Sequence, residues 1–153
     1  MNRTKLGLVL WILTAFAAAA IGSLYGPGEW YRALNKPSFN PPNWIFAPVW
    51  SCLYLLMGIA AWGVWKKNGF CAAHGFWFTQ LVLNGLWSWL FFGLHRPDLS
   101  FYDILLLNAA ITGTTIGFWR IQPWTGGILL PYQAWVLFAS VLNYELWRLN
   151  PRP

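Results

Sequence analysis

The residues of this sequence best suited to bind a ligand are aromatic side chains at helical spacing on three predicted helix faces, two of which also carry polar or small residues. The first group is Gln80, Asn84, Trp87 and Phe91, at positions i, i+4, i+7 and i+11 of one helix face. Two further faces repeat the pattern, with Phe46, Trp50, Leu53 and Met57 on one and Trp135, Phe138, Ala139 and Leu142 on the other. Three such faces that converge would line a flat apolar pocket, which suits a planar or polycyclic lipophile.

The acidic residues do not form a catalytic pair in this sequence. Asp98 and Asp103 are five positions apart, which separates them by about 140° around a helix. The segment from Ser100 to Asp103 instead predicts an N-terminal helix cap with an acidic third position. Glu145 and Arg148 are three positions apart, which predicts a local ion pair at a helix end. A hydrolytic enzyme is therefore disfavoured.

The cysteines and histidines lie too far apart to bind one metal ion or form a disulfide. Cys52 lies about 20 Å of helix rise from the turn that precedes Cys71, and a disulfide needs α-carbons within about 7 Å. His74 and His95 bracket one predicted helix and are about 31 Å apart. We expect no metal site and no required cofactor.

Composition identifies the class of protein. Only 9% of the 153 residues are charged and 58% are hydrophobic, whereas soluble domains carry roughly 25% charged residues. The formal net charge of +6 arises from ten Lys and Arg against four acids. This balance reflects a scarcity of acids rather than a dense basic surface, so a nucleic-acid-binding protein is disfavoured.

Runs with few charges predict an all-α membrane protein, because about 20 helical residues cross a bilayer. We predict a bundle of five transmembrane helices at residues 6–24, 44–65, 71–94, 100–120 and 127–148. They form a single domain, residues 1–153, with a lid loop at residues 25–43. Lys and Arg divide five against five between the two sides, so charge does not set the orientation. The short termini are compatible with the multi-pass protein of a bacterial cell envelope that we expect.

Two interpretations explain the aromatic faces equally well, namely ordinary packing between helices and the lining of a pocket. Asn84 favours the pocket. A side-chain amide at mid-membrane depth is costly to present to lipid, so Asn84 should face a neighbouring helix or a cavity with Gln80 and Trp87. Pro48 and Pro131 lie inside the predicted helices and predict kinks or locally freed carbonyls, which would help to widen a cavity but are also common in membrane helices.

The loop at residues 25–43 is predicted to cover the pocket. Prolines and glycines at residues 26–28 and 36–42 prevent a continuous helix. Arg32 and Lys36 would lie near the pocket mouth, where they could meet the carboxylates of an amphiphilic ligand. Solvated loop cations explain both residues equally well.

Three motifs that span nearly the whole chain resemble a known family. They are Trp30-Tyr31-x-x-Leu34-x-Lys36-Pro37-x-Phe39-x-Pro41-Pro42-x-Trp44-x-Phe46-x-Pro48-Val49-Trp50, then Gln80-Leu81-x-Leu83-Asn84-x-x-Trp87-x-x-x-Phe91-Phe92-Gly93, and Pro131-Tyr132-x-Ala134-Trp135-x-x-Phe138-Ala139-x-x-Leu142-Asn143-Tyr144. Their combination resembles the tryptophan-rich sensory protein family, TspO, also called translocator protein or peripheral benzodiazepine receptor.

The resemblance implies a five-helix membrane bundle, usually a homodimer, whose pocket binds porphyrins, sterols and benzodiazepine-type drugs beneath the first loop. By matching position, it implies the ligand-binding residues Ala20, Trp30, Trp44, Phe46, Trp50, Asn84, Trp87, Trp135, Phe138, Ala139 and Leu142. Many relatives have Trp where this chain has Phe39, so a lid contact that needs an indole at this position is not implied.

Two shorter patterns carry weaker implications. Leu142, Tyr144 and Arg148 match a proposed cholesterol pattern and the sterol-linked segment of the family, although an interfacial helix end explains them better. Gly113 and Gly117 form a small-residue face that permits close helix contact. That contact would form either in a dimer or within one monomer.

Two classes of function remain open. The first is a receptor or carrier of porphyrins and related lipophiles, acting in transport, in regulation of tetrapyrrole metabolism or in stress signalling. The second, suggested by the porphyrin degradation ascribed to some relatives, is a light- and oxygen-dependent enzyme that would use Trp50 and Trp135. A proton-coupled exporter is disfavoured, because the sequence predicts no acid at mid-membrane depth.

Overall fold

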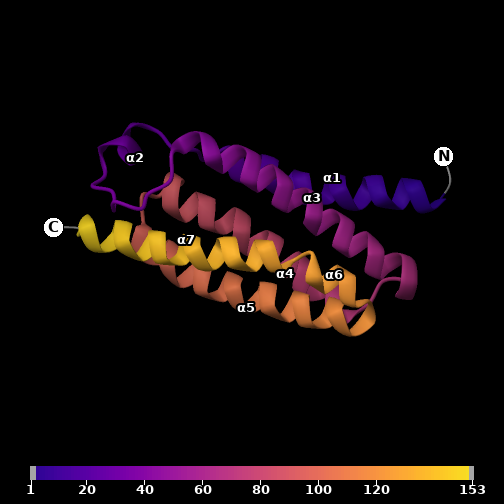
Figure 1. Ribbon diagram of the computed structural model, residues 1–153. Coiled ribbons are helices and arrows are strands. Elements are labelled where there is room, and N and C mark those ends of the chain that lie inside the picture. Colours follow the sequence, from indigo (N-terminus) through magenta and orange to yellow (C-terminus); the bar gives the residue numbers. More distant parts are fainter. Residues whose placement is uncertain (1–2, 152–153) are drawn as a thin grey trace.

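A computed structural model describes residues 3–151 as a bundle of helices, with no strand in that range (Figure 1). The loop that carries the short second helix lies at the same end of the bundle as the C-terminus, and the N-terminus lies at the opposite end. The elements in chain order are α1 (Arg3–Ser23), α2 (Glu29–Ala33), α3 (Asn43–Asn68), α4 (Ala72–Ser88), the π-helical η1 (Trp89–Gly93), α5 (Pro97–Ile121), α6 (Pro123–Gly127) and α7 (Leu130–Leu149).

The predicted five-helix membrane bundle is confirmed. Within residues 3–151, four segments are long and apolar enough to cross a bilayer, namely α1, α3, α5 and the stretch of α6 and α7. The remaining span is built differently, because α4 has 17 residues and continues directly into the five residues of η1. The protein is thus an integral multi-pass membrane protein.

Glycines bring the helices into close contact at the end of the bundle away from the loop. A β-carbon at Gly58 of α3 would lie 2.6 Å from the α-carbon of Ile12 in α1. A β-carbon at Gly63 would lie 2.6 Å from the indole ring of Trp124 in α6. Because small residues allow backbones to approach closely, these two positions fix α3 against α1 and α6.

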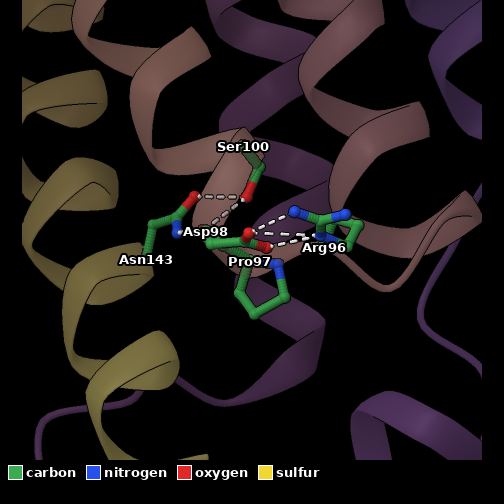
Figure 2. Close-up of polar contacts among 5 residues, drawn as sticks. All are labelled: Arg96, Pro97, Asp98, Ser100 and Asn143. Atoms are coloured by element: carbon green, nitrogen blue, oxygen red, sulfur yellow. Dashed lines mark hydrogen bonds and ion pairs between the residues drawn. The ribbon is translucent and has the colours of Figure 1, made fainter. Parts of the chain in front are cut away.

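The predicted cap at the start of α5 is wrong. The helix begins at Pro97, three residues earlier, because proline suits the first turn of a helix. Ser100 lies inside the helix, where its hydroxyl donates to Pro97 O at 3.1 Å and to Asn143 Oδ1 of α7 at 3.0 Å (Figure 2). The buried carboxylate of Asp103 has no hydrogen-bond partner among the residues that the structure describes.

The predicted kink at Pro131 is also wrong, whereas Pro48 does lie inside α3. Pro131 occupies the first turn of α7, where its missing amide hydrogen removes no helical bond. The predicted helix is divided because α6 ends at Gly127 and α7 begins at Leu130. A helix start at this point makes the proline harmless.

Three smaller predictions have clear outcomes. Arg148 and Glu145 form the predicted ion pair at 2.6 Å, and both cysteines are free. Gly113 and Gly117 face α4 of the same monomer, since β-carbons there would lie 2.9 Å from the Phe76 ring and 3.0 Å from Ala73 Cβ. This small-residue face is therefore used within the monomer.

Candidate ligand-binding cavity

A cavity of about 620 Å³ lies in the loop half of the bundle, enclosed by α1, α3, α4 with η1, α5 and α7. Its wall is mainly aromatic and aliphatic. Eight of the predicted ligand-binding residues line it, namely Ala20, Phe46, Trp50, Asn84, Trp87, Trp135, Ala139 and Leu142. The three faces read from the sequence thus meet around one space, although Leu53 and Met57, at the far end of the α3 face, are buried in the packed core instead.

Three other predicted residues do not line the cavity. Trp30 stacks on His95 with 4.4 Å between ring centroids, and Phe138 packs between Phe39 and Trp135. Trp44, at the start of α3, is 73% exposed. Trp30 and Phe138 therefore pack outside the cavity against residues of its wall and lid, whereas Trp44 faces outward.

Several lining residues were not predicted, because they carry no distinctive sequence signal. Phe16 and Ala19 of α1 and Ile104 and Leu107 of α5 complete the wall, and Tyr31 of α2 closes the lid side. The aliphatic and small residues among them are of the kinds found on any buried helix face. Among these five residues, Tyr31 is the one that lies in a quoted motif, and that position could have indicated its role.

A chain of buried hydrogen bonds forms the floor of the cavity. Tyr54 donates to Asn84 Oδ1 at 2.5 Å, and Asn84 Nδ2 donates to the Tyr132 hydroxyl at 3.1 Å. Tyr132 in turn donates to Gln80 Oε1 at 2.6 Å. These bonds join α3, α4 and α7 and satisfy polar groups that lipid could not satisfy. The amide of Asn84 therefore faces both a neighbouring helix and the cavity.

A second polar cluster holds one wall of the cavity. The indole of Trp87 donates to Asn143 Oδ1 at 2.9 Å, and Asn143 Nδ2 donates to Pro97 O at 2.8 Å. Figure 2 shows Asn143 of α7 reaching Ser100 and Pro97 at the start of α5, with the ion pair of Arg96 and Asp98 alongside. The Trp87 ring is thereby fixed by residues from two other helices.

The indole of Trp135 differs from that of Trp87. Its Nε1 is buried and has no hydrogen-bond partner among the described residues. The ring contacts Phe46 across the cavity, with 5.9 Å between centroids. Trp135 is therefore held by ring packing alone, so its ring can turn without loss of an internal hydrogen bond.

The lid is fastened by packing and by hydrogen bonds. Tyr31 is 5% exposed and packs on Phe91 and Phe92 of η1. Burial raises the pKa of the Tyr31 phenol, while its hydrogen bond to the Asn40 side chain lowers it. The short helix α2 therefore closes the loop end of the cavity.

A pair of reciprocal bonds latches the lid to the end of α7. The backbone amide of Asn35 donates to Asn150 Oδ1 at 2.9 Å, and Asn150 Nδ2 donates to Asn35 O at 2.9 Å. These two residues are 115 positions apart in the chain, so the latch joins the lid to the far end of the sequence.

Comparison with known proteins agrees with this architecture. A profile of the TspO/MBR family matches residues 8–148. The chain belongs to the TspO/MBR family. It is 41% identical to the tryptophan-rich protein TspO of Archaeoglobus fulgidus over 156 residues, which cover 98% of this chain and 99% of the relative.

Two further relatives of the family also match over most of their length. The translocator protein of Homo sapiens is 38% identical over 138 residues, which cover 85% of this chain and 82% of the relative. The tryptophan-rich sensory protein of Cereibacter sphaeroides is 38% identical over 134 residues, which cover 88% and 85%. The resemblance stated from the motifs is thus confirmed over most of the chain.

The two lid cations expected near the cavity have other partners in this member of the family. Arg32 pairs with Glu29 on the exposed side of α2, at 2.5 Å. Lys36 Nζ donates to Arg32 O and Leu34 O and lies 4.8 Å from the centre of the Tyr31 ring. Neither cation lines the cavity, so a contact with a ligand carboxylate would require either side chain to leave these partners.

The sterol-linked segment does not form a single surface. Leu142 lines the cavity, whereas Tyr144 is exposed and packs against Phe101 and Trp147. Arg148 pairs with Glu145 on the outside of α7. One sterol could not contact all three matching residues in this arrangement.

Proposed function

We propose that this chain is a membrane receptor or carrier that binds porphyrins and related lipophiles, including sterols and benzodiazepine-type drugs. The observation that carries the proposal is the cavity of about 620 Å³, which indoles border from three helices. Trp50, Trp87 and Trp135 offer flat apolar surfaces to a planar ligand, and Tyr54 and Asn84 supply polar groups at the floor.

The relatives support both a carrier and a sensor. One is named translocator protein and another tryptophan-rich sensory protein. A cavity that binds a lipophile serves either role, in transport, in regulation of tetrapyrrole metabolism or in stress signalling. We propose a bacterial cell envelope as the location of this multi-pass protein.

The second candidate function is light- and oxygen-dependent degradation of a bound porphyrin. Trp50 and Trp135, the two oxidisable indoles that this reaction would use, both line the one cavity. Trp135 has no internal hydrogen bond to lose. Binding without bond breakage requires neither feature, so the two candidates can be separated by experiment.

The test is a titration of the purified protein with protoporphyrin in the dark, followed by tryptophan quenching, and then illumination. A receptor or carrier shows saturable quenching that weakens in Trp135→Phe or Asn84→Leu, with equal bleaching in parent and variants. A defined product that forms only when both Trp50 and Trp135 are present would instead establish the enzyme. Absence of saturable quenching would contradict porphyrin binding.

We also propose a homodimer, formed through the outward face of α4. Gly75 and Gly85 on this helix have no atom within 4 Å of a β-carbon position, and Val82 beside them is 69% exposed. Small residues on an outward helix face favour close contact with another helix in lipid. A Val82→Cys variant should crosslink into dimers in membranes, whereas Ile116→Cys, exposed on α5, should not crosslink.

A further inference from the structure

The exposed part of the cavity wall is confined to one place in the bundle. Lining residues on α4, η1, α5 and α7 are all buried or half-buried, as is Tyr31 of the lid. The exposed lining residues lie at the end of α1, in the loop that follows and at the start of α3. We call this set the mouth: Ala20, Ser23, Tyr25, Gly26, Pro27, Asn43, Ala47 and Ser51.

The mouth lies between two neighbouring membrane spans. Helices α1 and α3 run antiparallel, and the contact of Ile12 with Gly58 sets their register. In this register Ser51 stands opposite Ala19, and Ala47 stands opposite Ser23. Small residues therefore face one another across the seam where α1 ends and α3 begins, and they leave the cavity open between the helices.

The mouth extends from the membrane interface into the hydrocarbon region. Trp44 is exposed at the start of α3, and exposed indoles at span ends lie at the level of the lipid headgroups. Ser51 follows seven residues later, which is about 10 Å of helix rise toward the bilayer centre. The inner part of the mouth is therefore bounded by acyl chains rather than by water.

The two mouth hydroxyls on the helices are compatible with an apolar passage. Ser23 Oγ donates to Ala20 O at 2.7 Å, and Ser51 Oγ donates to Ala47 O at 2.8 Å. Each hydroxyl is thus satisfied by the backbone of its own helix, so neither serine keeps a free donor for a passing ligand. A lipophile can pass Ser23 and Ser51 without stripping water from their hydroxyls.

The opposite route, from water through the lid, is closed. Tyr31 is 5% exposed and packs on the η1 rings, while Asn35 and Asn150 exchange two hydrogen bonds. A ligand that arrived from water would have to break the latch and displace Tyr31. The path through the mouth requires neither change.

We infer that the cavity is loaded sideways from the bilayer, through the mouth between α1 and α3. This inference rests on the proposed function, and it assigns a ligand class. The ligand is an amphiphile already dissolved in the membrane, whose apolar body enters past Ala47 and Ser51. Its polar end stays at the interface beside Tyr25 and Asn43.

The test measures how fast protoporphyrin IX binds to the protein in phosphatidylcholine vesicles, by stopped-flow tryptophan quenching in the dark. The variant Ala47→Phe narrows the mouth, and Ala47→Leu is a milder change that is more readily accommodated. The matched control is Ala17→Phe, because Ala17 is exposed on α1 but does not line the cavity. The variant Asn150→Ala loosens the lid.

In the mouth variants we expect association and dissociation rates to fall together by roughly tenfold, with Kd within about twofold of the parent, because a narrowed path changes rates rather than end states. Ala17→Phe and Asn150→Ala should keep the parental association rate. An unchanged association rate in every mouth variant, or a faster one in Asn150→Ala, would overturn the inference. Failure of the parent protein to show saturable quenching would instead overturn the proposed function, and the inference with it.

Discussion

The two halves of the bundle use the same helices in opposite ways. Away from the loop, α3 presents Gly58 and Gly63, and the neighbouring helices approach its backbone directly. Toward the loop the same helix presents Phe46 and Trp50, which meet Trp135 and Tyr132 of α7 ring against ring. In the half away from the loop, small residues let the helices pack directly against one another. In the half nearer the loop, large aromatic rings keep the helices apart. The comparison teaches that residue size along one helix sets where the bundle is solid and where it is hollow.

The largest effect is expected from a single methyl group in the solid half. Gly58→Ala should destabilise the protein by about 3 kcal/mol, at the upper end for overpacking, because the clash is with the backbone of Ile12. Thermal unfolding in detergent measures this loss.

The matched control for Gly58→Ala is Gly127→Ala. A β-carbon at Gly127, the last residue of α6, would lie 3.6 Å from the Trp119 ring, which is an ordinary van der Waals distance, and alanine is the better helix former. This variant should unfold at or above the parental temperature. Equal melting temperatures for both variants would mean that the solid half is not closed by glycine.

A smaller effect separates two tryptophans, one from each half. Trp77 is fully buried and donates to Met57 O at 3.1 Å, so Trp77→Phe leaves a void and loses a hydrogen bond. We expect a loss of stability of about 1–2 kcal/mol. Trp135→Phe borders an existing cavity and loses no internal hydrogen bond, so its stability should change by less than about 0.5 kcal/mol.

The same pair should behave in the reverse order in ligand binding. Trp135→Phe should weaken protoporphyrin binding by roughly tenfold, which is about 1.4 kcal/mol. Trp77→Phe should leave the dark titration unchanged once it is folded. If Trp77→Phe weakened binding as much as Trp135→Phe, the division of the bundle into two halves would be wrong.

Much of this division could be predicted from the sequence. The runs with few charged residues predicted the membrane spans, because a helix that crosses the bilayer excludes charge over about 20 residues. Helical spacing grouped Asn84 with Trp87 and Trp135 with Ala139, which the structure turns toward one space. Spacing could not distinguish the inner end of a face from the outer end, so Met57 was grouped with Phe46 although it lies in the solid half.

The remaining features depend on where helices start and on which neighbours they meet. Pro97 starts α5 and Pro131 falls in the first turn of α7, so capping and kink predictions based on local sequence were wrong at both. The π-helical turn at Trp89–Gly93 arises where the backbone hydrogen bonds change to the i→i+5 pattern, and no residue type in the sequence predicts this change. The contributions of Ile104 and Leu107 to the wall likewise depend on tertiary packing.

A small effect is expected at the latch of the lid. Asn150→Ala removes the two bonds to Asn35 and a third bond from Asn150 Nδ2 to Leu146 O at the end of α7, and it should change stability by less than about 1 kcal/mol. Amide hydrogen exchange in the peptide that contains Asn35 should rise several-fold, because that amide loses its acceptor. Asn68→Ala, at the exposed end of α3, is the control. Unaltered exchange near Asn35 would show that packing of Tyr31 alone closes the lid.

The central claim is that the hollow half of the bundle is a binding site. The most direct test fills it, by comparing Ala139→Phe, which faces the cavity, with Ala134→Phe, which lies on the exposed side of the same helix. Both proteins should melt near the parental temperature. We predict that Ala139→Phe loses saturable quenching by protoporphyrin in the dark while Ala134→Phe keeps it. Parental binding by a folded Ala139→Phe protein would contradict the account.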